Sequence, residues 1–223
     1  TDNTHTKFRA IRDLGIQHPV GCAAHLLDLS LKRVYNCENF RGIFKKTKKL
    51  SNHFRSSITA MRTLFFLQHQ SNIQHPKKTK SYSKTRWASW IILARRILEL
   101  KPYLIHYFTE NEMHFEHQLN NQEWTILLDL VNMLGDVEQV ITIIESDTTT
   151  LDLIYPYIQG LIVKVSNYIP LTDIGATIKN ELKTDLKERW HDFQFQSRTI
   201  LTVATYLNPQ FSFMIENSDY YQP

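Results

Sequence analysis

Apolar residues recur every three to four positions along most of the chain, which is the spacing of one buried face of an α-helix. The first clear stripe contains Ala23, Leu27 and Leu31. Further stripes begin at Ile43, Trp87, Trp124, Leu151 and Ile174. The chain has 6 glycines in 223 residues, whereas an all-β fold needs many glycine-rich turns. From about Asn39 onward we therefore expect antiparallel helices and no β-sheet.

Four places interrupt or blur this pattern. Residues 17–21 contain a proline and are too short for a helix, so they predict a brief strand. The stripe over residues 39–68 fits one long helix or two. Residues 70–83 are polar and basic and contain a proline, and a loop of this length is typically functional or mobile. Pro156 falls within a helical stripe, so the helix either begins there or kinks there.

The overall composition is that of an ordinary folded protein, with 42% hydrophobic and 22% charged residues. A chain of 223 residues is long enough for one large domain or two small ones. No run approaches the ~18 apolar residues that a membrane helix requires, so we expect no membrane span. Two cysteines, Cys22 and Cys37, do not make a secreted disulfide framework, which favours a reduced, intracellular compartment. Because the chain begins at Thr1 without a methionine, we expect it to be part of a longer protein.

The chain carries a net charge of +4 with an isoelectric point near 9.0, which permits a polyanionic partner without requiring one. Its basic residues are concentrated in two clusters, while acidic residues dominate positions 122–152. The clusters consist of Lys45, Lys46, Lys48 and Lys49, and of Lys77, Lys78 and Lys80. Such clusters are either solvated faces of helices and loops or contacts to nucleic-acid phosphates, which give affinity without sequence specificity.

Cys22 and His25 form a Cys-x-x-His pair that suggests a metal site. A structural zinc site needs four ligands, usually as two such pairs, and the nearby candidates in sequence are His18 and Cys37. The alternative is a buried cysteine and a hydrogen-bonded histidine at the start of a helix. No HExxH, P-loop, GxGxxG or GxSxG motif is present in the sequence.

Arg86 and Trp87 closely follow the second lysine cluster. A cation beside an aromatic ring is the combination that engages a nucleic-acid backbone and unstacked bases. The alternative is that Trp87 belongs to the apolar stripe that continues with Trp90 and Ile91, and is part of the core.

Five stretches, taken in this order, resemble the catalytic domain of hAT-superfamily transposases and their domesticated relatives, many of which carry BED-type zinc fingers. They are TDN at residues 1–3, Cys22-x-x-His25, TRWAS at residues 85–89, residues 150–161, and LTVATYLNPQF at residues 201–211. The resemblance implies a mainly α fold. In that fold, residues 1–35 form part of an RNase H-like α/β core and residues 36–223 form a large all-helical insertion domain.

The resemblance also implies a catalytic role for Asp2, as the second of three carboxylates at the active site of a DNA transposase. Such carboxylates hold two Mg²⁺ or Mn²⁺ ions, which activate the attacking oxygen and stabilise the leaving oxygen of a phosphodiester. The other two carboxylates would lie before Thr1 and after Pro223, so this chain alone would not cut DNA. Without the resemblance, an aspartate so near a chain end is a solvated residue or a helix cap.

In hAT enzymes the tryptophan that corresponds to Trp87 lies near the active site and stacks on a base flipped out of DNA. In hAT proteins the Cys-x-x-His pair that corresponds to Cys22 and His25 is a signature of the core and not part of a zinc finger. Residues 207–211, LNPQF, depart from the family's usual LDPRF, as decayed and domesticated copies do.

The resemblance leads us to expect a nuclear protein, part of a DNA-binding transposase that transfers strands with its metal ions. The alternative is a domesticated, non-catalytic DNA-binding or dimerising factor. In either case we expect a homo-oligomer formed through a region beyond this chain. A third alternative is a helical scaffold with no nucleic-acid role.

Overall fold

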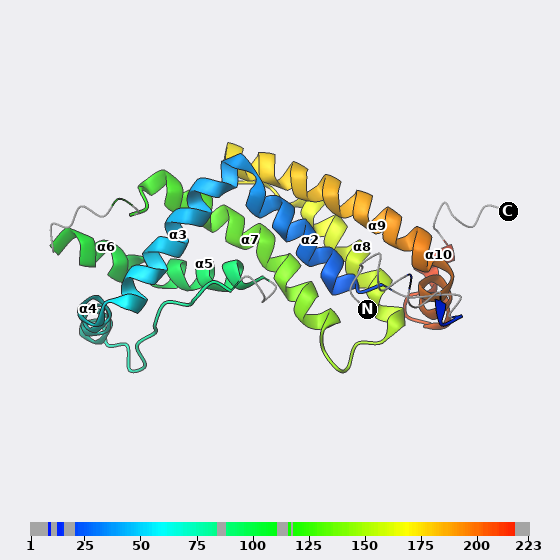
Figure 1. Ribbon diagram of the computed structural model, residues 1–223, viewed down its shortest axis with the longest axis horizontal. Coiled ribbons are helices and arrows are strands. Elements are labelled where there is room, and N and C mark those ends of the chain that lie inside the picture. Colours follow the sequence, from blue (N-terminus) through cyan, green and yellow to red (C-terminus); the bar gives the residue numbers. More distant parts are fainter. Residues whose placement is uncertain are drawn as a thin grey trace. The chain divides into compact units, whose positions relative to one another are not determined.

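Helices account for all regular structure in the part of the chain that the computed structural model describes (Figure 1). The described residues are Arg9, 13–15, 21–83, 88–110, Glu116 and 118–216, without the side chains of 192–199 and of Glu216. In chain order the helices are α2 (Ala23–Asn36), α3 (Glu38–Ser56), α4 (Ile58–Gln70), α5 (Ser89–Glu99), α6 (Lys101–Glu110), α7 (Asn121–Ile144), α8 (Leu151–Asn167), α9 (Asp173–Leu207) and α10 (Ser212–Glu216).

The prediction of a mainly α protein is confirmed, and over the described residues after Asn39 no β-strand interrupts the helices. The strand expected at residues 17–21 lies almost entirely outside the described residues. The RNase H-like α/β core that would contain this strand therefore stays a prediction. Among the described helices, none combines the length and the apolar character needed to cross a membrane.

The chain divides into two compact units, each assembled from separate stretches of sequence. Unit 1 contains Thr1–Val34, Asp136–Ile169 and Lys179–Pro223, and unit 2 contains Tyr35–Gly135 and Pro170–Ile178. Helices α7 and α9 each contribute residues to both units. The family resemblance predicts a different division, with a boundary after residue 35. That boundary separates an RNase H-like core from an insertion and is not defined by compactness, so it stays a prediction.

In unit 2, α3 packs against α4 and α5, and both of these pack against α6. Trp90 on α5 is completely buried, and its ring meets that of Phe40 edge-on with centroids 4.6 Å apart. The indole N–H donates to the hydroxyl of Thr47 at 3.0 Å, so the one polar atom of this large side chain is paired. The apolar stripe that contains Trp90 and Ile91 therefore forms core, as the sequence predicts.

The apolar stripe over residues 39–68 forms two helices, with the break at Ser57. The backbone of Ser57 is extended, at φ −101° and ψ 115°. Its hydroxyl oxygen accepts a hydrogen bond from the N–H of Ala60 at 3.1 Å, which caps the start of α4.

A buried carboxylate holds the beginning of α9 within unit 2. Asp129 on α7 is 1% exposed. Its Oδ2 accepts hydrogen bonds from the N–H of Leu171 (3.0 Å), the N–H of Thr172 (2.9 Å) and the Thr172 hydroxyl (2.8 Å). Gly175 lies against this carboxylate, and a Cβ at that position would overlap it. The positive end of the helix dipole adds to the hydrogen bonds in favouring the negative charge.

In unit 1, helix α8 runs through Pro156. The interpretation that a helix begins at Pro156 is wrong, because α8 begins at Leu151. Proline has no N–H, so the carbonyl of Asp152, four residues earlier, loses its usual helical donor. The buried hydroxyl of Thr205 donates to that carbonyl at 3.3 Å instead. The side-chain amide of Asn208 donates to the Asp152 carboxylate at 2.5 Å, so the end of α9 binds the start of α8 twice.

A second buried carboxylate, Asp185 on α9, organises the cations of unit 1. It is 2% exposed and accepts hydrogen bonds from Arg33 on α2 (3.0 Å) and from Arg189 (2.7 Å). The hydrogen bond and the negative charge of Asp185 raise the pKa of Arg33 above its ordinary value. Glu181 and Glu188 lie 3.8 and 3.7 Å from the same guanidinium, so this arginine faces three carboxylates.

Candidate nucleic-acid interface

The fold of unit 2 brings the two lysine clusters together, although they are well separated in sequence. The extended segment of residues 77–82 lies along α3 and runs in the opposite direction. The hydroxyl of Ser51 on α3 donates to the carbonyl of Lys80 at 2.6 Å, and the hydroxyl of Thr79 donates to the carbonyl of Ser51 at 3.2 Å. Farther along, the ring of Tyr82 meets that of Phe44 edge-on at 5.2 Å.

Side chains of α4 and α5 fix the beginning of this segment. The amide of Gln68, which is 1% exposed, donates to the Lys77 carbonyl at 3.1 Å and accepts from the Lys77 N–H at 2.8 Å. Arg96 donates to the Lys78 carbonyl at 2.7 Å. The segment that the sequence predicts as a functional or mobile loop is thus tied to the helices through its main chain. Its lysine side chains stay exposed.

Four basic residues of α3 lie away from its buried face. Lys45 and Lys49 are one turn apart, and Lys48 and Arg55 are two turns apart, so each pair lines up along the helix. Together with Lys78 and Lys80 of the neighbouring segment, they form what we call the basic flank. Arg55 is absent from the sequence prediction. Its seven-residue spacing from Lys48 is the signal that would have found it.

The described contacts separate the predicted lysines into two groups. Lys46 forms an ion pair with Glu123 at 2.6 Å, and Lys77 forms one with Glu99 at 3.1 Å. Burial raises the pKa of Glu99, but the hydrogen bonds and charges of Lys77 and Arg96 outweigh burial and leave this pKa below its ordinary value. The charges of Lys46 and Lys77 are therefore already compensated within the protein, which makes them weaker candidates for phosphate contacts.

The ammonium groups of Lys48 and Lys78 lie over aromatic rings. The ammonium of Lys48 lies 4.4 Å from the ring centroid of Tyr82 and 4.9 Å from that of Phe44, a cation–π arrangement that leaves the charge available. The ammonium of Lys78 lies 5.9 Å from the ring of Phe65. Among the described residues, no carboxylate lies within ion-pair distance of Lys45, Lys78, Lys80 or Arg55.

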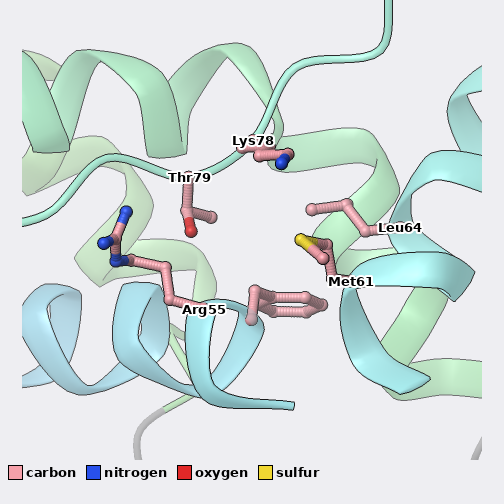
Figure 2. A pocket seen from close by; sticks show the side chains of 6 residues that line it. Arg55, Met61, Leu64, Lys78 and Thr79 are labelled. Carbon is pink, nitrogen blue, oxygen red and sulfur yellow. The ribbon is translucent and has the colours of Figure 1, made fainter. Parts of the chain in front are cut away.

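A pocket of about 250 Å³ opens at the end of the basic flank (Figure 2). Its apolar lining consists of Phe54, Met61 and Leu64. Its polar lining consists of Arg55, Lys78 and Thr79, with no acidic residue. Figure 2 shows that Arg55 comes from α3, Met61 and Leu64 from α4, and Lys78 and Thr79 from the extended segment.

The predicted residues Arg86 and Trp87 lie outside the described residues, but the structure fixes the two sides of the segment that contains them. The hydroxyl of Ser89 donates to the carbonyl of Ser83 at 2.6 Å and accepts from the N–H of Ser83 at 3.2 Å. Ser89 is the serine of the TRWAS motif, so these two hydrogen bonds join the motif's last residue to Ser83. Ala88 has a φ of 52°, in the left-handed region, where the chain turns into α5.

Cys22 and His25 meet at the start of α2. The N–H of His25 donates to the sulfur of Cys22 at 3.4 Å, in the manner of a serine at a helix N-cap. The donor is a main-chain group, so this contact involves the side chain of Cys22 and not the imidazole of His25. Within the described part of the chain, no three His, Cys, Asp or Glu side chains gather closely enough to hold a metal ion. Asp2 lies outside that part, and its role as a metal ligand stays a prediction.

The two units differ in charge. Unit 2 contains 15 of the chain's 26 lysines and arginines but 8 of its 22 aspartates and glutamates, which gives it a net charge of +7. Unit 1 has the remaining 11 basic and 14 acidic residues, a net charge of −3. The small net positive charge of the whole chain is therefore the sum of a strongly basic unit and a mildly acidic one. The basic flank belongs to the basic unit.

In comparisons with known proteins, no family model matches this chain, and no curated protein is similar enough to be a relative.

Proposed function

We infer that unit 2 binds the phosphate backbone of DNA through the basic flank. The observation that supports this most directly is the convergence of the two lysine clusters on one side of α3. Hydrogen bonds from Ser51, Gln68 and Arg96 create this convergence by acting on the main chain of the segment, which leaves its lysine side chains in solvent.

The mechanism is electrostatic. Each lysine or arginine that contacts a phosphate releases condensed counterions, so affinity depends steeply on salt and little on sequence. The net charge of unit 2 attracts DNA from a distance, and the basic flank provides the contacts. Lys46 and Lys77 contribute less, because each would first have to leave a carboxylate.

For the whole protein, the resemblance of the sequence to hAT transposases favours a transposase-derived, nuclear DNA-binding protein. Metal-dependent strand transfer would require Asp2 to act with two carboxylates outside this chain, holding Mg²⁺ or Mn²⁺. The alternative is a domesticated factor that binds DNA or dimerises without catalysis. The sequence of the longer parent chain separates these two: an upstream aspartate at the end of a strand and a downstream glutamate on a helix favour the enzyme.

The DNA-binding proposal can be tested with single substitutions on the basic flank. Lys45→Gln and Lys80→Gln should each weaken binding to duplex DNA of any sequence. Each should also reduce the slope of log affinity against log salt by about one. Lys187→Gln is the matched control, because Lys187 is an exposed lysine of unit 1. Fluorescence anisotropy at several salt concentrations measures both quantities.

The outcomes separate the alternatives. An equal effect of all three substitutions would show that net charge, and not the basic flank, governs binding. The absence of any salt-dependent binding would overturn the proposal and favour the helical scaffold.

A further inference from the structure

The extended segment of residues 77–82 carries two aliphatic hydroxyl groups, which differ in their surroundings. Thr79 is 3% exposed and donates to the carbonyl of Ser51, so its hydroxyl is enclosed and already bonded. Ser81, two residues later, is exposed. Its hydroxyl forms no hydrogen bond within the described part of the chain. Ser81 is therefore the hydroxyl of this segment that another protein can reach.

Lysines precede Ser81 at short and regular distances. Lys77, Lys78 and Lys80 stand four, three and one residues before it, and their side chains are exposed. Protein kinases select their substrates partly by the pattern of charges around the hydroxyl. Among the described residues, no carboxylate lies within ion-pair distance of Lys78 or Lys80. These two ammonium groups are therefore available to the carboxylates of a kinase.

The main chain of the segment is held in place without covering these side chains. Gln68, Arg96 and Ser51 form hydrogen bonds with main-chain groups of residues 77–80. The bonds keep the segment extended, while the lysine side chains and Ser81 remain in solvent. The residues that a kinase would recognise are thus accessible on the folded protein.

Ser81 lies within the basic flank. The residue before it is Lys80, a member of the basic flank, whose carbonyl is bonded to Ser51 on α3. The residue after it is Tyr82, whose ring centroid lies 5.2 Å from that of Phe44 on α3 and 4.4 Å from the Lys48 ammonium. A group attached to Ser81 is therefore a close neighbour of cations from both parts of the basic flank.

A phosphate at this position would act directly on those cations. Phosphoserine carries a charge of about −1.5 to −2 at neutral pH and three strong acceptor oxygens. The flexible side chains of Lys48 and Lys80 would donate charge-assisted hydrogen bonds to it. Each ammonium group that binds the phosphoserine is lost to DNA, and the added negative charge repels the phosphates of the DNA.

We propose that Ser81 is a phosphorylation site for a protein kinase that selects lysines before the serine, and that its phosphorylation weakens DNA binding by the basic flank. The phosphoryl donor is ATP with Mg²⁺. The Ser81 oxygen attacks the γ-phosphorus, the bond between that phosphorus and the β-phosphate oxygen breaks, and ADP leaves. The hydroxyl proton passes to a carboxylate of the kinase. The regulatory part of this proposal rests on the proposed function, whereas the modification site does not.

The first experiment asks whether the folded chain is a substrate. The chain is incubated with Mg-ATP and the catalytic domain of a kinase that selects lysines three and four residues before serine, and mass spectrometry locates the phosphate. Ser81 should be the residue modified, and Lys78→Gln should slow the reaction. Ser81→Ala should abolish the incorporation.

A peptide with the sequence of residues 74–84 shows the reactivity of the segment outside the fold. Phosphorylation of this peptide but not of the folded chain would overturn the proposal, because the site would then be inaccessible in the native protein. Incorporation that persists in full in Ser81→Ala would also overturn it.

The second experiment measures DNA binding by the chain with phosphoserine incorporated at position 81 during translation. Fluorescence anisotropy at about 0.1 M salt should show roughly tenfold weaker binding to duplex DNA than for the unmodified chain, the effect of losing one or more phosphate contacts. Phosphoserine at position 146 is the matched control for added charge, because Ser146 is an exposed serine of unit 1. It should weaken binding much less. Ser81→Ala should leave the affinity unchanged.

The outcomes separate this proposal from the proposed function. Equal losses from phosphoserine at positions 81 and 146 would show that net charge governs binding, and would overturn the regulation. If Lys45→Gln weakens duplex binding but phosphoserine at position 81 does not, the regulation is wrong and DNA binding stands. If Ser81 is phosphorylated but the unmodified chain binds no DNA, the proposed function is wrong and the modification site stands.

Discussion

Each unit contains a buried aspartate that accepts several hydrogen bonds, but the two aspartates accept them from different kinds of donor. In unit 1, Asp185 accepts from two arginines and compensates their charge. In unit 2, Asp129 accepts from two backbone N–H groups and a hydroxyl at the start of α9. These three donors to Asp129 are neutral groups, and together they fix the start of α9. In unit 1 the buried carboxylate thus compensates two arginines, whereas in unit 2 it anchors the main chain at the start of a helix.

The difference teaches that a basic composition and a basic surface are separate properties. Unit 1 contains 11 lysines and arginines. Among them, Arg33 lies near Asp185, Glu181 and Glu188, and Lys164 pairs with Asp136 at 3.0 Å. Whether a cation is available for a ligand depends on the hydrogen bonds of nearby carboxylates.

The largest expected effect concerns Asp129. Asp129→Ala removes the acceptor of three donors at the start of α9, and should lower the free energy of unfolding by about 3 kcal/mol. Chemical denaturation measures the loss. Asp129→Asn keeps one acceptor oxygen and should cost less. A change below about 0.5 kcal/mol in Asp129→Ala would contradict the importance of this anchor.

The matching change in unit 1 should have a somewhat smaller effect. Asp185→Ala should cost about 2 kcal/mol, less than the ~3–5 of a fully buried ion pair, because Arg33 and Arg189 remain partly hydrated. Glu188→Gln is the control, since the side chain of Glu188 is 62% exposed and its carboxylate lies 3.7 Å from Arg33. This substitution should change stability by less than about 0.5 kcal/mol. Equal losses in both variants, measured by denaturation, would show that burial of Asp185 is not what matters.

A third substitution in this series places a second carboxylate beside Asp152 in unit 1, with no cation added to compensate it. Asn208→Asp replaces the donor to Asp152 by a second negative charge. Hydrogen bonds from Thr150 and Asn208 lower the pKa of Asp152, despite some opposition from burial. In the variant this pKa should rise. The protein should lose about 1 kcal/mol at neutral pH, and the loss should shrink as acid protonates the pair. A loss that persists unchanged at low pH would point to packing instead of charge.

The smallest expected effect is a pH dependence in unit 2. Burial lowers the pKa of His53, whose Nε2 lies 3.2 Å from the Tyr107 hydroxyl. The folded state therefore favours the neutral ring. The contribution of His53 to stability is complete above the unfolded pKa of about 6.5 and is lost as pH falls from there through the folded pKa. Thermal melts across this range should show a steeper decline for the natural protein than for His53→Phe. Parallel declines would exclude His53 as the source.

Sequence periodicity was enough to predict a mainly helical chain, because a buried helical face repeats at a fixed interval, but it did not predict α6. It was not enough to divide the stripe over residues 39–68, since Ser57 interrupts the backbone without interrupting the apolar spacing. The hydrogen bond from Ser51 to Lys80 joins a side chain to a main-chain group far along the chain, and no local pattern reports such a pair. For that reason the lysines could be named from sequence, but their convergence, and the inclusion of Arg55, required the structure.

The replacement donor for Pro156 makes two distant positions depend on each other. With proline in place, losing the Thr205 hydroxyl leaves the Asp152 carbonyl without a donor. If position 156 first regained an N–H, Thr205 would be dispensable. The cost of changing either residue therefore depends on the state of the other, so the two substitutions are not additive. Over generations the order of events matters: replacing Pro156 first opens a route to losing Thr205, whereas the reverse order passes through a less stable intermediate.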